Sequence, residues 1–567
     1  MNGITILIIS LVVLFLAYIL YGRWIAKKWG VDPKRKTPAY EQRDGVDFEP
    51  AHKSVVFGHQ FASIAGAGPI NGPIQAAIFG WVPVLLWILI GGVFFGAVQD
   101  FASMFASVRN KGRSIGYIIE KYIGKTGKKI FLLFCWLFCI LVVAAFADIV
   151  AGTFMGFTVT DGVQSANISA NGAVATTSVM FIVFAVALGF ILKYTKLHTA
   201  INTTIAIVML VASILIGLTF PIFLSLDVWH LLIFGYIFVA SVVPVWILLQ
   251  PRDYLNSYLL IVMIVAAVLG VFVANPQVNL PAFIGFEVDG SYLFPILFVT
   301  IACGAVSGFH SLVSSGTASK QISNEKDMLP VSFGSMLLEC MLAVIALIAV
   351  ASFASGEAAV QGWNTPAQIF AGAVANFLTT LGLPLDIVFT LVTLSISAFG
   401  LTSLDSVARV GRLSFQELFL DDSITDENMG KLRKILTNKY FATIITLVLA
   451  YALTLVGYKN IWALFGASNQ LLSVFAFLAC AVFLKRCKKV RWFMYIPLGF
   501  MLAVTFTALG MTVYDKARAF ITSSSADVFG DTLQLVFASL IIIFGICVVT
   551  EGFKKLFAKK DNQEALD

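Results

Sequence analysis

Several long stretches of the chain contain no charged residue. Among them are residues 54–99, 197–226 and 254–286, from which Asp, Glu, Lys and Arg are absent. Each of these stretches exceeds the roughly 20 apolar residues that cross a bilayer as an α-helix. Of all 567 residues, 59% are hydrophobic and 12% are charged, whereas a soluble globular protein carries about 25% charged residues. The chain is therefore predicted to be an all-α polytopic membrane protein, with the lipid bilayer as its surroundings.

Composition also excludes several classes of protein. The net charge of +7 does not indicate a nucleic-acid partner, because the basic residues form short runs between apolar segments. The seven cysteines lie in apolar segments or basic loops, so a disulfide framework is not expected. The longest polar stretches, residues 23–53 and 421–439, are too short to bury a core of their own. Function must reside in the membrane part, and nothing in the sequence predicts an oligomeric state.

Apolar segments between polar residues predict about fifteen membrane crossings. They are expected near residues 3–22, 55–79, 81–108, 129–155, 173–192, 198–220, 230–250, 254–275, 293–318, 331–355, 385–405, 439–457, 461–484, 491–513 and 531–551. A further apolar segment, residues 365–381, would invert every later loop if it crossed. It is predicted to be an external helix lying in the interface.

Basic residues predict the orientation of the chain. Alternate loops are rich in Lys and Arg, and of the 38 basic residues only Lys459, Lys516 and Arg518 fall in the opposite loops. By the positive-inside rule, the amino terminus is expected outside and the carboxyl terminus in the cytoplasm. The first span has no basic residue before it, so it is expected to be a mature helix and not a cleaved signal peptide.

Four regions are expected along the chain. Residues 1–54 form the first membrane helix and a basic cytoplasmic loop, and residues 55–410 form the core. Residues 411–438 form a cytoplasmic loop, and residues 439–567 hold the last membrane helices and a short basic tail.

The second span is predicted to be a broken helix. Its centre, residues 65–73, holds three glycines and two prolines, which a regular helix does not accommodate. Unwound backbone at membrane depth is costly unless it lines a cavity or binds something, and discontinuous helices indicate a transporter's binding site. The candidate substrate-binding residues of this segment are Ala65, Gly66, Gly68, Pro69, Gly72 and Pro73.

Two further breaks are expected. One lies at Pro244 in the seventh span, and the other lies in the ninth, where small and hydroxyl residues surround His310. The second and seventh spans are five crossings apart and run in opposite directions. This spacing favours a five-plus-five inverted repeat, with halves at about 55–220 and 230–410. Pro244 and Ser307 are accordingly added to the candidate substrate-binding residues.

Four ionisable residues are predicted to share the inner half of the membrane. At about 1.5 Å of rise per residue, His59 lies on the order of 6 Å from the cytoplasmic end of its span, and Asp100, His310 and Glu339 about 12 Å. Charges at this depth are functional by default, and histidine titrates near neutral pH. This layer is the candidate for carrying a coupling proton.

Other polar residues have simpler interpretations. Asp148 lies alone in the outer half and either holds a helix contact or has a function, while Asp405 is expected to pair with Arg409 one helical turn later. The hydroxyls of Ser314, Ser315 and Thr317 form a possible Na⁺ site, although hydroxyls also pack membrane helices routinely. No metal site or other cofactor is predicted. The proton is the expected coupling ion, with Na⁺ the alternative.

Competing classes lack their motifs. The chain contains neither H-E-x-x-H nor G-x-G-D, which intramembrane proteases would show, and no G-x-x-x-x-G-K-[ST] of an ATP-driven pump. An enzyme is therefore not predicted. A channel also uses broken helices, but two inverted breaks among fifteen helices favour alternating access.

Six motifs carry a resemblance to a known family. They are GHQFASIAGAGPINGP (58–73), GAVQDF (96–101), RNKGRSIG (109–116), PRDYL (251–255), CGAVSGFHSLVSSGT (303–317) and LFGASNQLL (464–472). Together they make the chain similar to the carbon starvation protein A family of bacterial inner-membrane transporters. The resemblance implies uptake of a small-molecule nutrient, short peptides or pyruvate, during starvation, with proton symport for the pyruvate carriers. It also implies kinship with the amino acid-polyamine-organocation superfamily and a LeuT-type fold. A Na⁺-coupled symporter of another small carboxylate or amino acid stays open as the alternative, with a channel after it.

Overall fold

The computed structural model describes thirteen stretches of the chain. These are residues 1–44, 48–155, 157–160, 163–166, 170–195, 199–243, 247–353, 363, 365–419, 430–455, 457–489, 491–522 and 528–558. The chain folds into two compact units, each assembled from three segments. Unit 1 comprises Met1–Ile6, Cys139–Leu280 and Ile345–Tyr458, and unit 2 comprises Leu7–Phe138, Pro281–Val344 and Lys459–Asp567.

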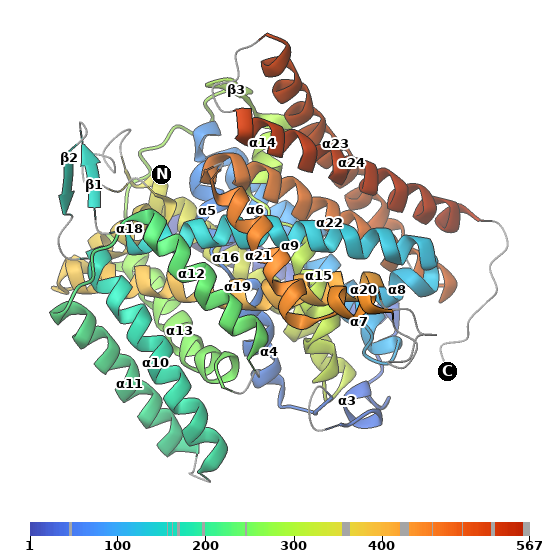
Figure 1. Cartoon of the computed structure of the whole chain (residues 1–567), viewed down its shortest axis with the longest axis horizontal. Coiled ribbons are helices and arrows are strands. Elements are labelled where there is room, and N and C mark those ends of the chain that lie inside the picture. Colours follow the sequence, from blue (N-terminus) through green and yellow to red (C-terminus); the bar gives the residue numbers. More distant parts are fainter. Residues whose placement is uncertain are drawn as a thin grey trace. The chain divides into compact units, whose positions relative to one another are not determined.

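Unit 1 is built mainly of long apolar helices. Its elements are β1 (Phe157–Thr160), β2 (Val163–Ala166), α10 (Ala170–Tyr194), α11 (Thr199–Thr219), α12 (Leu226–Val242), α13 (Leu249–Ala274), α18 (Pro366–Thr379), α19 (Leu385–Phe419), α20 (Lys431–Leu436) and α21 (Lys439–Thr454). Strands β1 and β2 pair antiparallel, with Phe157 opposite Ala166. Helices α10 and α11 run side by side (Figure 1). A buried cluster that includes Phe181, Leu259 and Leu394 joins α10, α13 and α19.

Unit 2 contains most of the short and irregular elements. They are η1 (Ala17–Gly22), α2 (Arg23–Trp29), α3 (Pro38–Glu41), α4 (Lys53–Ile64), α5 (Gly68–Ala76), η2 (Ala77–Phe79), α6 (Trp81–Gly91), η3 (Gly92–Gly96), α7 (Ala97–Arg109), α8 (Ile115–Tyr122), β3 (Glu287–Val288), β4 (Ser291–Tyr292), α14 (Leu293–Thr300), α15 (Gly308–Gly316), η4 (Ala318–Lys320), η5 (Glu325–Asp327), η6 (Leu329–Gly334), α23 (Trp492–Ile521) and α24 (Val528–Phe557). Strands β3 and β4 pair antiparallel, with Glu287 opposite Tyr292. Four more helices have residues in both units: α1 (Gly3–Leu16), α9 (Lys125–Phe154), α16 (Ser335–Ala351) and α22 (Tyr458–Arg486).

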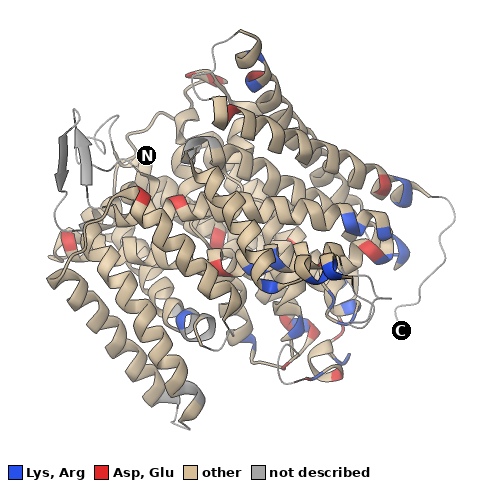
Figure 2. Ribbon diagram, in the orientation of Figure 1, with Lys and Arg blue, Asp and Glu red and all other residues tan. Residues whose placement is uncertain are grey.

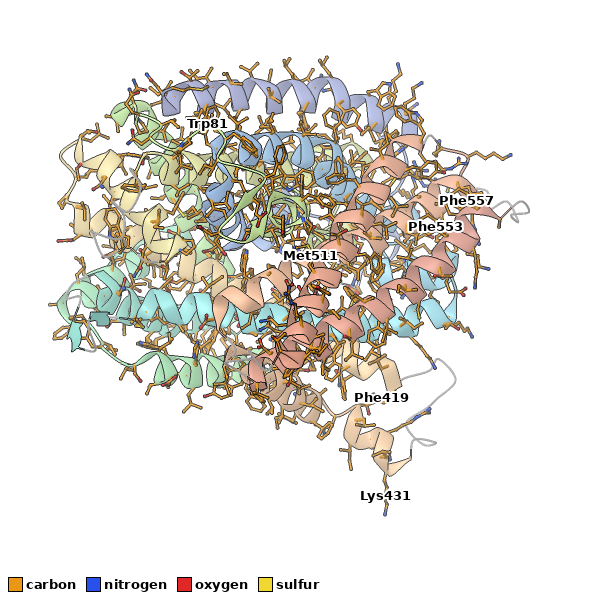
Figure 3. All side chains as sticks on the ribbon, turned by 90° about the horizontal axis from the view of Figure 1, so that it is seen from above. Trp81, Phe419, Lys431, Met511, Phe553 and Phe557 are labelled. Atoms are coloured by element: carbon orange, nitrogen blue, oxygen red, sulfur yellow. The ribbon has the colours of Figure 1, made fainter. Side chains whose placement is uncertain are left out.

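Aromatic rings pack the interior of unit 2. The Trp29 ring stacks on Phe101 with centroids 5.2 Å apart and lies 5.9 Å from Phe493, which ties α2, α7 and α23 together. Rings of this size dominate the energetics of a core. On α24, Phe553 and Phe557 lie one turn apart with ring centroids 5.8 Å from each other (Figure 3).

Ten continuous helical stretches among the described residues are long and apolar enough to cross a membrane. Their middles are almost free of charge, as Figure 2 shows for the tan shafts of α10 and α11. Large apolar side chains stay exposed along these helices, including Val208 and Leu215 on α11. Exposed apolar stripes of this length suit contact with lipid, so the chain is a polytopic α-helical membrane protein.

Helix α18 corresponds to the segment predicted to lie in the interface. Thr365 caps it through a reciprocal pair of hydrogen bonds with Gln368, and Pro366 occupies the first turn, where proline costs no hydrogen bond. The helix has 14 residues, fewer than the roughly 20 of a crossing, and packs against α13 and α19. Its placement in the interface stays a prediction.

Candidate functional site

The second span is broken, as its glycines and prolines predict. Helix α4 ends at Ile64, and α5 begins at Gly68. Between them Ala65 has φ −76° and ψ 57°, which is not helical. Pro69 lies in the first turn of α5. The first N–H groups of a helix have no partner within it, so this break places backbone donors inside a buried segment.

The ninth span is broken as well, at the position the sequence indicates. Helix α14 ends at Thr300 and α15 begins at Gly308. Ser307, at the start of α15, has an extended backbone with φ −135° and ψ 124°. The intervening residues 301–307 are buried, so a second stretch of non-helical backbone lies inside unit 2.

Glycines bring these two broken helices into direct contact. A Cβ atom built at Gly68 would lie 2.6 Å from the Cβ of Cys303, and one built at Gly72 would lie 2.7 Å from the carbonyl oxygen of Thr300. A Cβ atom at Gly304 would lie 3.7 Å from the Cα of Pro69. Only residues without a Cβ permit backbones to approach so closely. The α4/α5 and α14/α15 breaks therefore form one site.

Three ionisable side chains meet beside this site. The Nδ1 atom of His310, on α15, lies 3.2 Å from Oδ2 of Asp100 on α7, and its Nε2 atom lies 3.3 Å from Oε2 of Glu339 on α16. All three side chains are fully buried. Among the described residues, Asp100 Oδ1, His310 Nε2 and both carboxyl oxygens of Glu339 have no hydrogen-bond partner, so His310 and Glu339 lie close without a hydrogen bond between them. We call Asp100, His310 and Glu339 the buried trio.

Both carboxylates of the buried trio follow a turn of π-helix. The turn η3 (Gly92–Gly96) precedes the helix of Asp100, and η6 (Leu329–Gly334) precedes that of Glu339. Such turns are rare and occur frequently at functional sites. At η3, a Cβ atom on Gly96 would lie 2.3 Å from the carbonyl oxygen of Ala305. The turn thus packs directly on the break between α14 and α15.

His59 is separate from the buried trio, although it was predicted in the same layer. Its Nε2 atom lies 3.1 Å from Oγ1 of Thr317, and among the described residues no ion pair joins it to an acid. The neighbouring Gln60 donates to the Ser314 hydroxyl at 2.8 Å. The structure therefore divides the predicted layer into three residues that meet and one that contacts the far end of α15.

The hydroxyls considered for Na⁺ take part in hydrogen bonds within the chain. Ser314 accepts from Gln60, Thr317 donates to the carbonyl oxygen of Val313 at 3.1 Å, and Ser315 accepts from the Ile115 N–H at 3.0 Å. Two of these three bonds join different helices, so these hydroxyls hold α15 against α4 and α8.

Buried amides belong to the site, and the sequence interpretation missed them. Asn469 of α22 bonds to Ser307 and to the Phe309 N–H, and Gln99 donates to the Ser307 carbonyl oxygen at 2.5 Å. Both amides are fully buried. Ionisable residues in apolar spans predict the buried trio, whereas the signal for Asn469 and Gln99 is an uncharged amide in such a span. Asn469 lies within the motif LFGASNQLL.

Three predictions concern residues of unit 1. Pro244 lies outside the described residues, and α12 ends just before it at Val242. Asp148 is not alone, because its Oδ1 atom lies 2.9 Å from Nε2 of His230. This contact between α9 and α12 is the structural role, one of the two alternatives predicted for Asp148.

The predicted pairing of Asp405 with Arg409 is wrong. Asp405 is bound by Arg252 of α13 and Tyr236 of α12, and all three side chains are buried or half-buried. Arg409 instead donates to the carbonyl oxygens of Ala240 and Val243, each at 2.5 Å. The carbonyls at a helix carboxyl end lack partners and attract cations. Arg409 therefore binds the carboxyl end of α12 and not Asp405, which lies one turn away on its own helix.

Apolar helices of crossing length, two broken helices in contact and a buried ionisable trio together define a polytopic membrane protein with a polar site inside its helices. The chain belongs to the family described as carbon starvation protein CstA, which matches residues 2–361 and 353–508.

Named relatives cover most of the chain. It is 33% identical to the peptide transporter CstA of Escherichia coli, over 89% of the chain and 80% of that protein. It is 32% identical to the peptide transporter CstA of Bacillus subtilis, over 98% and 97%. It is also 32% identical to the pyruvate/proton symporter BtsT of Escherichia coli, over 90% and 82%. A crystal structure of the Eremococcus coleocola manganese transporter aligns over 89% of the chain and 95% of its own, with 12% identity and a TM-score of 0.48.

Proposed function

We propose that this protein is a secondary active transporter that imports short peptides or pyruvate across the bacterial inner membrane by proton symport. The observation that carries the proposal is the position of His310, which lies between Asp100 and Glu339 on the helix that begins at one of two touching breaks. The names of the relatives supply the two substrate classes.

The buried trio is the proposed proton site. With both acids ionised and His310 protonated, the three groups carry one net negative charge. Charge without a full set of partners is costly in a buried site, so one further proton neutralises the trio and changes the electrostatic energy of the helices that carry it. Because His310 lies on α15, proton binding and release act directly on a broken helix. This link is how a proton gradient would drive a change in access.

Both proposed substrates present a carboxylate, and the backbone at the breaks can receive it. The N–H group of Gly68, at the start of α5, lies at the positive end of a helix dipole, whereas the N–H group of Gly66 already donates to the Ile64 carbonyl oxygen at 2.8 Å. Gly72, with Pro69 and Pro73, shapes this segment against α14. The Ser307 hydroxyl is bonded to Asn469, so its proposed role is to hold the second break and not to contact substrate with that hydroxyl.

We propose a LeuT-type core, and the number of apolar helices supports about fifteen crossings for the chain. Ten long helices within the described ranges are candidate crossings. The two broken helices and three shorter apolar helices, 226–242, 258–274 and 439–454, bring the number to fifteen. The two broken helices that touch are the second and ninth spans, which are seven crossings apart. The second and seventh spans, five crossings apart, stay the proposed pair of the five-plus-five repeat. The amino terminus outside and the carboxyl terminus inside follow from the basic loops. No cofactor is proposed beyond the coupling ion.

The test is uptake into liposomes containing the purified protein. Labelled pyruvate, a labelled dipeptide and a labelled tripeptide are offered under an inward proton gradient, with and without Na⁺. Proton-driven, saturable uptake of one substrate, lost in His310→Gln and retained in His59→Gln, is the expected result. Uptake that requires Na⁺, or that persists in His310→Gln, would refute coupling through the buried trio. Uptake that does not saturate would indicate a channel.

A further inference from the structure

One buried amide of unit 2 contacts the start of the helix that carries His310. Asn469, fully buried on α22, accepts a hydrogen bond from the Phe309 N–H at 3.0 Å through its Oδ1 atom. Its Nδ2 atom donates to the Ser307 hydroxyl at 3.0 Å, and lies 3.8 Å from Sγ of Cys303. One side chain therefore contacts residues on both sides of Gly308, where α15 begins.

These contacts replace the ordinary cap of a helix. A Ser, Thr, Asp or Asn before the first turn of a helix often caps that turn with its own side chain. Ser307 occupies that position but makes no such bond to α15, because its hydroxyl is engaged with Asn469. The Phe309 N–H, in the first turn of α15, is satisfied by Asn469 instead. The cap of α15 thus comes from another helix.

The backbone of the two helices is shaped for this contact. A Cβ atom built at Gly308 would lie 2.4 Å from the carbonyl oxygen of Asn469 and 2.4 Å from the Ser473 N atom. Any other residue at Gly308 would push α15 away from α22. The close approach and the capping bond therefore fix the same point, one residue before Phe309 and two before His310.

We infer that Asn469 is a positioning residue for the proton site: by capping α15 from α22 it sets where His310 stands between Asp100 and Glu339. The inference about coupling rests on the proposed function, whereas the capping itself does not. Losing the cap loosens the first turn of α15, which changes the distances of 3.2 Å from His310 to Asp100 and 3.3 Å from His310 to Glu339.

The next residue of α22 offers a matched control. Gln470 is also a buried amide, but it donates to the carbonyl oxygen of Phe298 on α14, before the break. Asn469→Leu and Gln470→Leu remove buried amides of the same helix that contact opposite sides of one break. A general loss of packing would affect both variants alike, whereas positioning of His310 concerns Asn469 alone.

Amide hydrogen exchange tests the capping without any transport. In purified protein, Asn469→Leu is expected to speed exchange over residues 308–316 by roughly five- to tenfold, the order given by loss of one helix cap, while Gln470→Leu leaves that segment unchanged. Equal exchange in Asn469→Leu and the unmodified protein would overturn the inference. If Asn469→Leu does not fold, Asn469→Asp keeps the acceptor oxygens. Unaltered exchange over 308–316 is then expected, and faster exchange would overturn the capping.

Uptake as a function of external pH tests the effect on coupling. Asn469→Leu is expected to move the pH of half-maximal uptake by about half a unit or more, and Gln470→Leu is expected to change only the maximal rate. A midpoint that stays fixed in Asn469→Leu, or moves equally in both variants, would overturn the positioning role. If the unmodified protein shows no proton-driven uptake at all, the proposed function fails, and the exchange experiment still decides the capping.

Discussion

Gly72 of α5 lies against the backbone of Thr300 at the end of α14, and a Cβ atom at Gly72 would meet the Thr300 carbonyl oxygen at 2.7 Å. The same Cβ atom would lie 3.2 Å from the Cα atom of Ile301. Both neighbours are backbone atoms next to a break, so neither can rotate away as a flexible side chain would. The junction of the two broken helices therefore requires a residue without a side chain at position 72.

Gly72→Ala is expected to destabilise the protein and abolish uptake. Overpacking of this kind costs on the order of 1–3 kcal/mol, and the clash separates the helices that form the site. Gly58→Ala on α4 is the matched control, because nothing lies within 4 Å of its added Cβ, and alanine favours a helix by roughly 0.5–1 kcal/mol over glycine. Thermal unfolding in detergent and uptake in liposomes measure both. Equal unfolding temperatures for the two variants would contradict the packing described.

Ser314→Ala is expected to leave the ion dependence of uptake unchanged. Its hydroxyl accepts a hydrogen bond from Gln60, so its removal costs about 1 kcal/mol of stability without removing an ion ligand. Uptake at several Na⁺ concentrations, before and after the substitution, provides the measurement. A Na⁺ dependence that is present in the unmodified protein and lost in Ser314→Ala would favour the alternative of a Na⁺ site on α15.

Glu325→Gln is expected to destabilise unit 2. Glu325 is fully buried and accepts hydrogen bonds from Arg109 at 2.9 Å and from the Asp32 N–H at 2.8 Å, so it joins the loop after α2 to the end of α7. Removing one partner of a buried ion pair costs about 3–5 kcal/mol. The prediction is checked by thermal unfolding near neutral pH.

Glu49→Gln provides the control for Glu325. Glu49 is exposed and paired with Arg43, and exposed pairs contribute little, so no measurable shift in unfolding temperature is expected. The hydrogen bond and charge of Arg43 hold the pKa of Glu49 below its ordinary value. Any small stabilisation by this pair is therefore present at neutral pH and disappears only as the pH falls through that lowered pKa. A similar loss of stability in both variants would contradict the assigned difference in burial.

Much of the architecture could be predicted because lipid imposes strict rules on sequence. A crossing helix must be apolar over its whole length, which makes spans such as 81–108 and 531–551 visible as long helices. Glycine and proline exclude regular helix, and both breaks in unit 2 fall where those residues or small ones gather. Spans and breaks depend on the residues of one segment, so a single sequence is enough to predict them.

The composition of the site could be predicted only in part. Rise per residue gives the depth of a side chain but not its rotation about the helix axis. Depth therefore groups His59 with Asp100, whereas the fold turns His59 toward Thr317. The partner of Asp405 is Arg252, 153 residues away in the sequence, and no local pattern identifies such a pair. Asn469 is an amide without a charge, so the position of charged residues does not predict its role.

The pair of Arg252 and Asp405 gives a last prediction. Removing one member of a buried ion pair strongly lowers stability, whereas replacing both members by apolar residues can leave stability nearly unchanged. Both side chains are fully buried. Removing either partner leaves an uncompensated charge, so Arg252→Met and Asp405→Leu are each expected to cost about 3–5 kcal/mol, whereas the double variant is expected to approach the stability of the unmodified protein.

A double-mutant cycle measured by thermal unfolding checks this expectation, and single variants that unfold like the unmodified protein would contradict it. Uptake by the folded double variant then separates two roles. Retained uptake means that the pair only joins α13 to α19. Loss of uptake in a stable double variant means that transport needs the charges of the pair or its hydrogen bonds with Tyr236.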